Sequence, residues 1–175
     1  MKPIHLIPLA NGESRGPSLD ILESLAAALA RSFRTPCRIR PETFDISFAL
    51  DEGRQQYYST AIIQKLERAS DPDARILGVT ACDLYVPVLT FVFGEAQLQG
   101  HCAVVSYYRL IEPGRSDLLP GRLAKEAIHE LGHTFGLRHC DDWNCVMSSS
   151  HAVERLDIKS ARFCSRCRQA MQPRI

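Results

Sequence analysis

The feature that most constrains this chain is the stretch HELGHTFGLRH, which runs from His129 to His139. On a helix, His129 and His133 lie one turn apart on the same face, where two neutral imidazoles can hold one zinc ion. Gly136 lets the chain leave the helix through a left-handed turn, so that His139 can fold back as a third ligand. Three protein ligands leave the fourth position to water, which predicts a catalytic zinc site rather than a structural one.

Glu130 stands beside the first histidine, where its carboxylate can reach that water. The predicted reaction is hydrolysis of a peptide bond. Zinc activates the water and polarises the carbonyl, and Glu130 takes the proton and passes it to the leaving amine. The alternatives are a solvated helix charge for Glu130 and a chance pattern for the histidines. The position beside His129 disfavours the first, and the spacing of Gly136 and His139 disfavours the second.

Four cysteines form a second pattern directly after the histidines. They are arranged as C-x4-C and, eighteen residues later, C-x2-C. Two pairs of thiolates predict a closed tetrahedral site for a structural zinc, although a single C-x2-C alone would also suit a redox pair. We therefore expect two zinc ions per chain, one catalytic and one structural. The expected ligands of the structural ion are Cys140, Cys145, Cys164 and Cys167.

A second zinc would also explain how the last part of the chain folds. Residues 137–175 include few large apolar side chains, and a structural zinc contributes on the order of 10 kcal/mol to folding. Nearby arginines would offset the negative charge of four thiolates. Because His139 and Cys140 are adjacent, we expect that ordering the second ion helps to fix the last ligand of the first.

The remaining cysteines and histidines are expected to be structural. Cys82 and Cys102 lie in apolar strand contexts. Cys37 has a faint likeness to an inhibitory thiol that caps a catalytic zinc, but a buried strand thiol is the favoured reading. His5 and His101 lie in or beside strands and have no ligand-like neighbours.

Length, charge and cysteine usage limit the class of protein. The 175 residues fit one domain with a sizeable core. A net charge of +1 gives no reason to expect nonspecific binding to nucleic acid or membranes, and no apolar run approaches membrane-spanning length. Seven cysteines favour metal binding and buried thiols over disulfides, and the N-terminus does not resemble a signal peptide. A cytoplasmic protein is predicted.

Hydrophobic periodicity predicts the order of strands and helices. A helix opened by Pro120 is expected to carry the histidine motif. Strands alternate with helices, which predicts an α/β fold with a mostly parallel sheet. The expected strands are 2–10, 37–40, 75–82, 90–96 and 102–110, and the other expected helices are 17–34, 54–69 and 160–171.

The combined string HExxHxxGxxHC-x4-C-x-M, followed by C-x2-C, resembles the archaemetzincins, a metzincin family with an extra zinc site. Segments 79–85 and 91–96 are also similar to strand regions of that family. The resemblance implies a zincin-like α+β fold with a twisted, mixed, five-stranded sheet and an active-site helix. It also implies a single catalytic domain, in which residues 1–136 precede a small C-terminal subdomain, 137–175, stapled by the second zinc.

The resemblance carries over roles to individual residues. His129, His133 and His139 become the catalytic zinc ligands, and Glu130 becomes the base. Met147 becomes the methionine turn, a polarizable floor beneath the zinc ligands. Some metzincins have a tyrosine after this methionine that stabilises the transition state, and none follows here. Three side chains are candidates for that role: His151, Tyr107 and Tyr108.

The resemblance also implies where a substrate would lie. Residues 91–96 become an antiparallel edge strand whose free backbone groups align an extended peptide, and Gly94 allows the substrate backbone to approach closely. The leading hypothesis is therefore an active zinc metallopeptidase, a monomer that cleaves peptides or unstructured segments. A non-catalytic zinc scaffold that binds peptides or partners is the alternative, which the intact Glu130 disfavours. Nucleic-acid binding through the basic, cysteine-rich C-terminal segment is disfavoured by the near-neutral charge and the lack of interleaved aromatic residues.

Overall fold

One large mixed sheet runs through the protein, whose computed structural model describes residues 2–12 and 16–171. Its central strands are parallel to one another, and its last strand runs antiparallel at the edge. A short strand, β3 (Phe44–Asp45), pairs with the last two residues of the N-terminal strand, Leu9 and Ala10. The main path has five strands and mixed direction, as the family resemblance implies. In sheet order they are β2 (Cys37–Ile39), β1 (Ile4–Ala10), β6 (Arg75–Thr80), β9 (Cys102–Ser106) and β8 (Gly94–Ala96).

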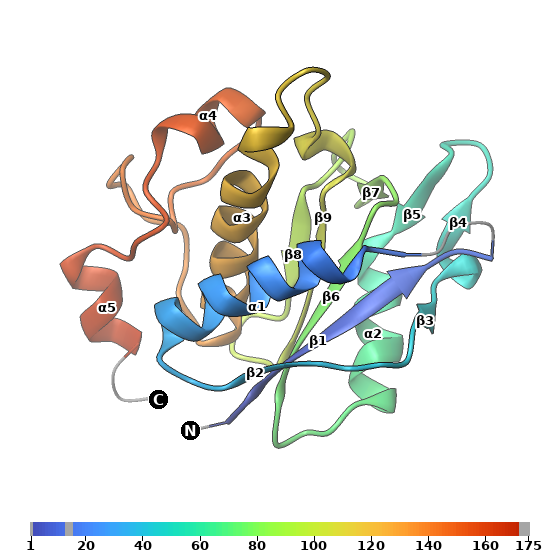
Figure 1. Ribbon diagram of the computed structural model, residues 1–175, viewed down its shortest axis with the longest axis horizontal. Coiled ribbons are helices and arrows are strands. Elements are labelled where there is room, and N and C mark those ends of the chain that lie inside the picture. Colours follow the sequence, from blue (N-terminus) through green and yellow to red (C-terminus); the bar gives the residue numbers. More distant parts are fainter. Residues whose placement is uncertain (1, 13–15, 172–175) are drawn as a thin grey trace.

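Each face of the sheet has its own hydrophobic core, because side chains alternate along the strands. On β6, Leu77 and Val79 point to the core that contains α1 (Leu19–Phe33) and α3 (Leu119–Thr134). Ile76 points to the core on the other face, which contains α2 (Ser59–Ala69). Figure 1 shows α1 crossing the sheet in front, with α3 behind it and upright. The histidine motif thus lies on a helix that is packed on one side by the sheet and on another by α1.

The prediction of a helix over 54–69 is wrong at its start. Residues 56–58 form strand β5 (Gln56–Tyr58), and α2 begins at Ser59. This strand pairs with β4 (Leu50–Asp51) and β7 (Leu84–Tyr85) in a three-stranded sheet that the sequence did not predict. Pairing with β7 outweighs the helical spacing of apolar side chains, because consecutive aromatic residues suit a strand.

Other predicted elements exist with shorter bounds. The strand expected over 75–82 ends at Thr80, and residues 90–93 lie outside β8. The strand expected over 102–110 ends at Ser106 and is followed by a 3₁₀ turn, η2 (Tyr108–Leu110). Two further 3₁₀ turns are η1 (Ser47–Ala49) and η3 (Ser116–Leu118).

The C-terminal part of the chain includes two short helices at the end of the molecule opposite the small sheet (Figure 1). The helix predicted over 160–171 is confined to α5 (Ser165–Met171), and α4 (Val153–Ile158) was not predicted. Loops connect these helices to α3. None of the helices in 2–12 and 16–171 has the length and apolar character needed to cross a membrane.

Candidate metal centres and cleft

Helix α3 places His129, Glu130 and His133 in its last two turns, with His129 and Glu130 buried. The helix ends in a left-handed turn, as the sequence predicts. The Gly136 amide donates to the His133 carbonyl at 2.8 Å, and Gly136 has a φ of 85°. The chain then turns back and brings His139 beside the other two histidines. We call His129, His133 and His139 the histidine site.

Hydrogen bonds to the backbone fix the protonation of two of these rings. Nδ1 of His129 donates to the Val146 carbonyl at 2.8 Å, and Nδ1 of His133 donates to the Leu137 carbonyl at 2.7 Å. A carbonyl can only accept, so the proton of each neutral imidazole is on Nδ1 and the lone pair is on Nε2. A metal-binding histidine usually donates its other ring N–H to a partner of this kind.

The two lone pairs face each other, which fits a cation between them. Nε2 of His129 and Nε2 of His133 are 3.1 Å apart. With no proton on either atom they cannot hydrogen-bond. Two nitrogens bound tetrahedrally to one zinc at 2.0–2.1 Å lie about 3.3 Å apart. The three side chains offer ligand atoms within 4.8 Å of one another, so the donor set suits zinc.

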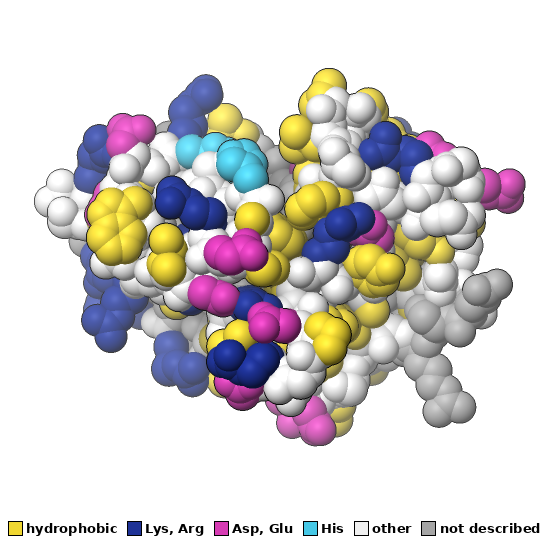
Figure 2. Space-filling model, turned by 90° about the horizontal axis from the view of Figure 1, so that it is seen from above, with side chains coloured by type: hydrophobic (Ala, Val, Ile, Leu, Met, Phe, Trp, Pro, Cys, Tyr) yellow, Lys and Arg dark blue, Asp and Glu magenta, His cyan; other side chains and the backbone are white. Residues whose placement is uncertain are grey.

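Glu130 lies in a cleft of about 310 Å³ that is also lined by His129, His139, the loop before β8 and residues 149–151. Figure 2 shows histidine side chains beside a hollow that crosses this face of the molecule. Burial raises the pKa of Glu130, and the nearby carboxylates of Glu126 and Glu95 raise it further. A carboxylate with little hydration and a raised pKa is a strong proton acceptor, as the predicted base must be.

Gly94 makes room for the Glu130 side chain and also lines the cleft, and the expected approach of a substrate to its backbone stays a prediction. A Cβ at Gly94 would lie 2.7 Å from Glu130 Cγ and 2.6 Å from the Val104 carbonyl oxygen. The predicted antiparallel edge strand is confirmed for residues 94–96, and residues 91–94 line the cleft.

Met147 packs directly under the histidine motif. It is fully buried, and a Cβ added at Gly132, between the two helical histidines, would lie 2.5 Å from its sulfur. Only a glycine at that position allows such an approach. The structure therefore places Met147 where a methionine turn would lie, beneath the histidine site.

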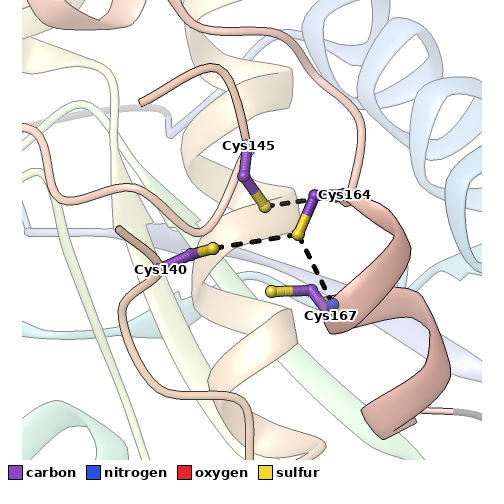
Figure 3. A group of neighbouring side chains, drawn as sticks. All are labelled: Cys140, Cys145, Cys164 and Cys167. Carbon is purple, nitrogen blue, oxygen red and sulfur yellow. Dashed lines mark hydrogen bonds between the residues drawn. The ribbon is translucent and has the colours of Figure 1, made fainter. Parts of the chain in front are cut away.

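The four predicted cysteine ligands also come together, and we call them the cysteine site. Figure 3 shows their sulfur atoms pointing toward a common centre, two from the loop after His139 and two at the start of α5. Sγ of Cys140 and Sγ of Cys164 are 3.8 Å apart. This is too long for a disulfide, whose sulfurs are about 2.05 Å apart. It matches two thiolates bound tetrahedrally to zinc at about 2.3 Å, whose separation is about 3.8 Å.

Hydrogen-bond donors surround the sulfurs, as negatively charged thiolates require. The Cys164 amide donates to Cys145 Sγ at 3.3 Å, and the Arg166 guanidinium donates to Cys140 Sγ at 3.4 Å. Burial raises the pKa of the Cys140 thiol, but donors that include Arg166 outweigh it and lower the pKa to about 7. Of the arginines expected to offset the thiolate charge, Arg166 makes direct contact.

Three consecutive residues connect the two sites, and we call them the shared segment: Cys145, Val146 and Met147. Cys145 offers its sulfur to the cysteine site, the Val146 carbonyl accepts from His129, and Met147 lies against Gly132. The Met147 carbonyl accepts from the Cys140 amide at 2.9 Å. This segment is a physical basis for the expected coupling between the two sites.

The structure also places the remaining predicted residues. Of the candidates for transition-state stabilisation, only His151 lines the cleft; Tyr107 is buried elsewhere, and Tyr108 lines a different pocket. Burial raises the pKa of the thiols of Cys37 and Cys102 to about 12. Both thus stay protonated, as expected of structural cysteines.

Sequence reasoning missed two charged residues next to the histidine site, Glu126 and Lys159, which form a buried ion pair. Glu126 precedes Glu130 by one helical turn, a spacing that would have placed both carboxylates on one helix face. Lys159 has no comparable signal, because it reaches the site from 33 residues further along the chain.

Comparisons with known proteins agree on one family. Residues 30–173 match the family model described as Peptidase family M54. An archaemetzincin of Methanopyrus kandleri is 47% identical over 124 residues, which cover 71% of this chain and 70% of that protein.

Two solved structures are similar over nearly the whole chain. The archaemetzincin of Archaeoglobus fulgidus, complexed with malonate, is 37% identical with a TM-score of 0.84, covering 96% of this chain and 99% of that one. A zinc-dependent peptidase from Methanocorpusculum labreanum is 28% identical with a TM-score of 0.83, again covering 96% and 99%.

Proposed function

Since this chain belongs to peptidase family M54, the archaemetzincins, and is a zinc-dependent peptidase of that family, we propose that its histidine site is the catalytic zinc centre and Glu130 its general base. The observation that carries this proposal is that the Nε2 atoms of His129 and His133 lie 3.1 Å apart with their lone pairs facing each other, beside the buried carboxylate of Glu130 in a cleft. His129, His133 and His139 would hold the ion. When bound, zinc makes a water molecule more acidic and polarises the carbonyl of the scissile peptide bond.

The chain's own residues then account for the proton transfers. Glu130 accepts a proton from the attacking water and donates it to the leaving amine. Its burial keeps bulk water away from the carboxylate, so that the proton is retained between the two steps. The Val146 and Leu137 carbonyls keep the helical histidines in the tautomer that leaves Nε2 free.

Substrate binding is proposed to use both walls of the cleft. The free edge of β8 would pair with an extended peptide, and residues 91–93 line the same wall. On the opposite wall, Ser150 Oγ is buried and has no hydrogen-bond partner among the described residues, and His151 lies next to it. We propose that these two side chains donate hydrogen bonds to the substrate in place of the absent tyrosine.

The cysteine site is proposed to hold a structural zinc, and residues 137–175 to form a subdomain that depends on it. This gives two zinc ions per chain, with Cys140, Cys145, Cys164 and Cys167 as ligands of the second. Free cysteines in this number suit a reducing compartment, so we propose a cytoplasmic enzyme.

The test compares wild type with Glu130→Gln on a diverse peptide library, with zinc counted in both. We expect two zinc ions in each protein and a loss of about 10²–10⁴-fold in kcat/KM in the variant, the usual contribution of a general base. Cleavage that persists in Glu130→Gln would contradict the mechanism. A two-zinc wild type that cleaves nothing in the library would favour the peptide-binding scaffold instead.

A further inference from the structure

A buried ion pair lies beside the histidine site, and the mechanism above gives it no role. Lys159 is 3% exposed and Glu126 is 4% exposed, and Lys159 Nζ lies 3.2 Å from Glu126 Oε1. Charges are costly to bury and are retained inside proteins only when they are paired and hydrogen-bonded. An apolar pair of similar volume would commonly be at least as stable, so stability alone does not explain this one.

Lys159 joins the helix that carries the histidines to the segment beneath it. Besides Glu126 on α3, its ammonium donates to the carbonyl of Ser148 at 3.0 Å. Ser148 follows Met147 directly, so this bond holds the end of the shared segment against α3. One side chain thereby sets the distance between the helix and the Val146 carbonyl, which orients His129.

The chain on both sides of Cys145 holds the segment that carries Lys159. Two residues that follow Lys159 pair with the chain around Cys145: the Ser160 amide donates to the Asn144 carbonyl at 3.0 Å, and the Val146 amide donates to the Arg162 carbonyl at 2.9 Å. These two hydrogen bonds fix the position of the backbone next to Lys159 relative to Cys145, and so they fix where its ammonium lies.

Charge gives the pair a second consequence. Glu126 and Glu130 are the two acidic side chains among the residues that line the cleft, one helical turn apart. Lys159 forms an ion pair with Glu126. Glu130 has no such ion pair among the described residues, so it is the cleft carboxylate that is free to accept a proton. The base is thus distinguished from its neighbour by the position of one lysine.

We propose that Lys159, together with Glu126, is a positioning device that fixes the shared segment against α3 and so orients the metal-binding face of the histidine site. This inference rests on the proposed function, because its readouts are metal affinity and turnover at that site. Residues of this kind, which orient metal ligands without touching the metal, typically contribute 10- to 100-fold to metal affinity or activity.

The test uses three variants of the full chain: Lys159→Met, Glu126→Gln and the double variant. Protein that retains zinc in the cysteine site is titrated with Co²⁺, whose visible spectrum distinguishes nitrogen ligands from thiolates. Urea unfolding, kcat and KM on a cleaved peptide are measured in parallel. Lys125→Met is the matched control, since Lys125 lies on α3 and its ammonium also donates to a backbone carbonyl of the C-terminal segment, that of Leu156.

We expect Lys159→Met to weaken Co²⁺ binding at the histidines and to lower kcat by about 10- to 100-fold, with KM within about 2-fold of wild type. The double variant has no unpaired buried charge, so it should recover stability but not Co²⁺ affinity or kcat. Lys125→Met should match wild type. If Lys159→Met alone does not fold, the double variant supplies the same comparison.

Two results would overturn the proposal. The first is wild-type Co²⁺ affinity in Lys159→Met. The second is recovery of affinity and kcat together with stability in the double variant, which would mean that Lys159 only compensates the charge of Glu126. A wild-type protein that takes up no Co²⁺ at the histidines would contradict the proposed function itself, because that function requires a metal at this site.

Discussion

The histidine site and the cysteine site adjoin in sequence, but the structure supports them in different ways. Two of the three histidines lie on a helix that packs in the main core, beneath the large sheet. The cysteines lie on a loop and on one short helix. Beyond its cysteines, the described segment 137–171 buries six large apolar side chains: Leu137, Val146, Met147, Leu156, Phe163 and Met171. We infer that the hydrophobic core holds the histidine site in place, whereas zinc binding at the cysteine site stabilises the fold of residues 137–171.

The largest expected effect tests the second half of this comparison. In Cys164→Ser the cysteine site loses a ligand, and the free energy of zinc binding, on the order of 10 kcal/mol, no longer supports residues 137–171. We expect one zinc ion per chain at most, fast amide hydrogen exchange in this segment and a loss of peptidase activity. Protein that lost the second zinc yet kept full activity and affinity at the histidine site would show that the two sites are independent.

The next effect tests whether the histidine site depends on the fold and not the reverse. His139→Ala should abolish activity while leaving the cysteine site and its segment folded, because His139 is exposed and packs little. At free zinc 100 times the dissociation constant, losing this binding site removes about 2.7 kcal/mol from the free energy of unfolding. Urea unfolding with and without added zinc measures that difference. Unfolding of 137–171 in this variant would contradict the asymmetry between the sites.

A smaller effect is expected where the two regions touch. In Gly132→Ala the new Cβ would lie 2.5 Å from Met147 Sδ, in a fully buried environment. Overpacking of this kind costs about 1–3 kcal/mol, against a gain of about 1 kcal/mol in helix propensity. We expect a net loss of about 1 kcal/mol in urea unfolding, together with weaker metal binding at the histidines. Adding Met147→Ala should relieve the clash, and a stabilised Gly132→Ala would show that the contact is looser than described.

The smallest effect concerns a link between α3 and the C-terminal segment that touches neither site. Arg122 is buried and its guanidinium contacts Asp157 at 2.6 Å and Glu112 at 2.7 Å. Hydrogen bonds from Arg122 lower the pKa of Asp157 in the folded state. The stabilisation is therefore present above the unfolded value, near 3.9, and is lost as the pH falls through the lower folded value.

We accordingly expect Arg122→Met to cost about 0.5 kcal/mol at neutral pH, because methionine fills the space and the partly exposed carboxylates of Asp157 and Glu112 are solvated by water. The difference from wild type in the free energy of unfolding should shrink as the pH falls below about 4. Acid titration followed by circular dichroism measures it. A difference that stays constant with pH would show that lost packing, rather than the ion pair, accounts for the change.

The sequence predicted the site better than the fold around it, for physical reasons. Metal ligands are few residue types at fixed spacings, so the His129 and Cys140 patterns identify both sites directly. The small sheet of β4, β5 and β7 was missed because its strands are two or three residues long and show no periodicity. The Glu126–Lys159 pair depends on tertiary contacts across 33 residues, which no local pattern encodes.

The shared segment has a consequence for how this chain can vary in length. Cys145, Val146 and Met147 each face a different partner, and the Met147 carbonyl returns to the Cys140 amide. One inserted or deleted residue between Cys140 and Met147 would shift a thiolate, a histidine's backbone acceptor and the residue under Gly132 all at once. We therefore expect this stretch to tolerate substitution at its exposed positions, such as Asp141 and Trp143, but not a change of length.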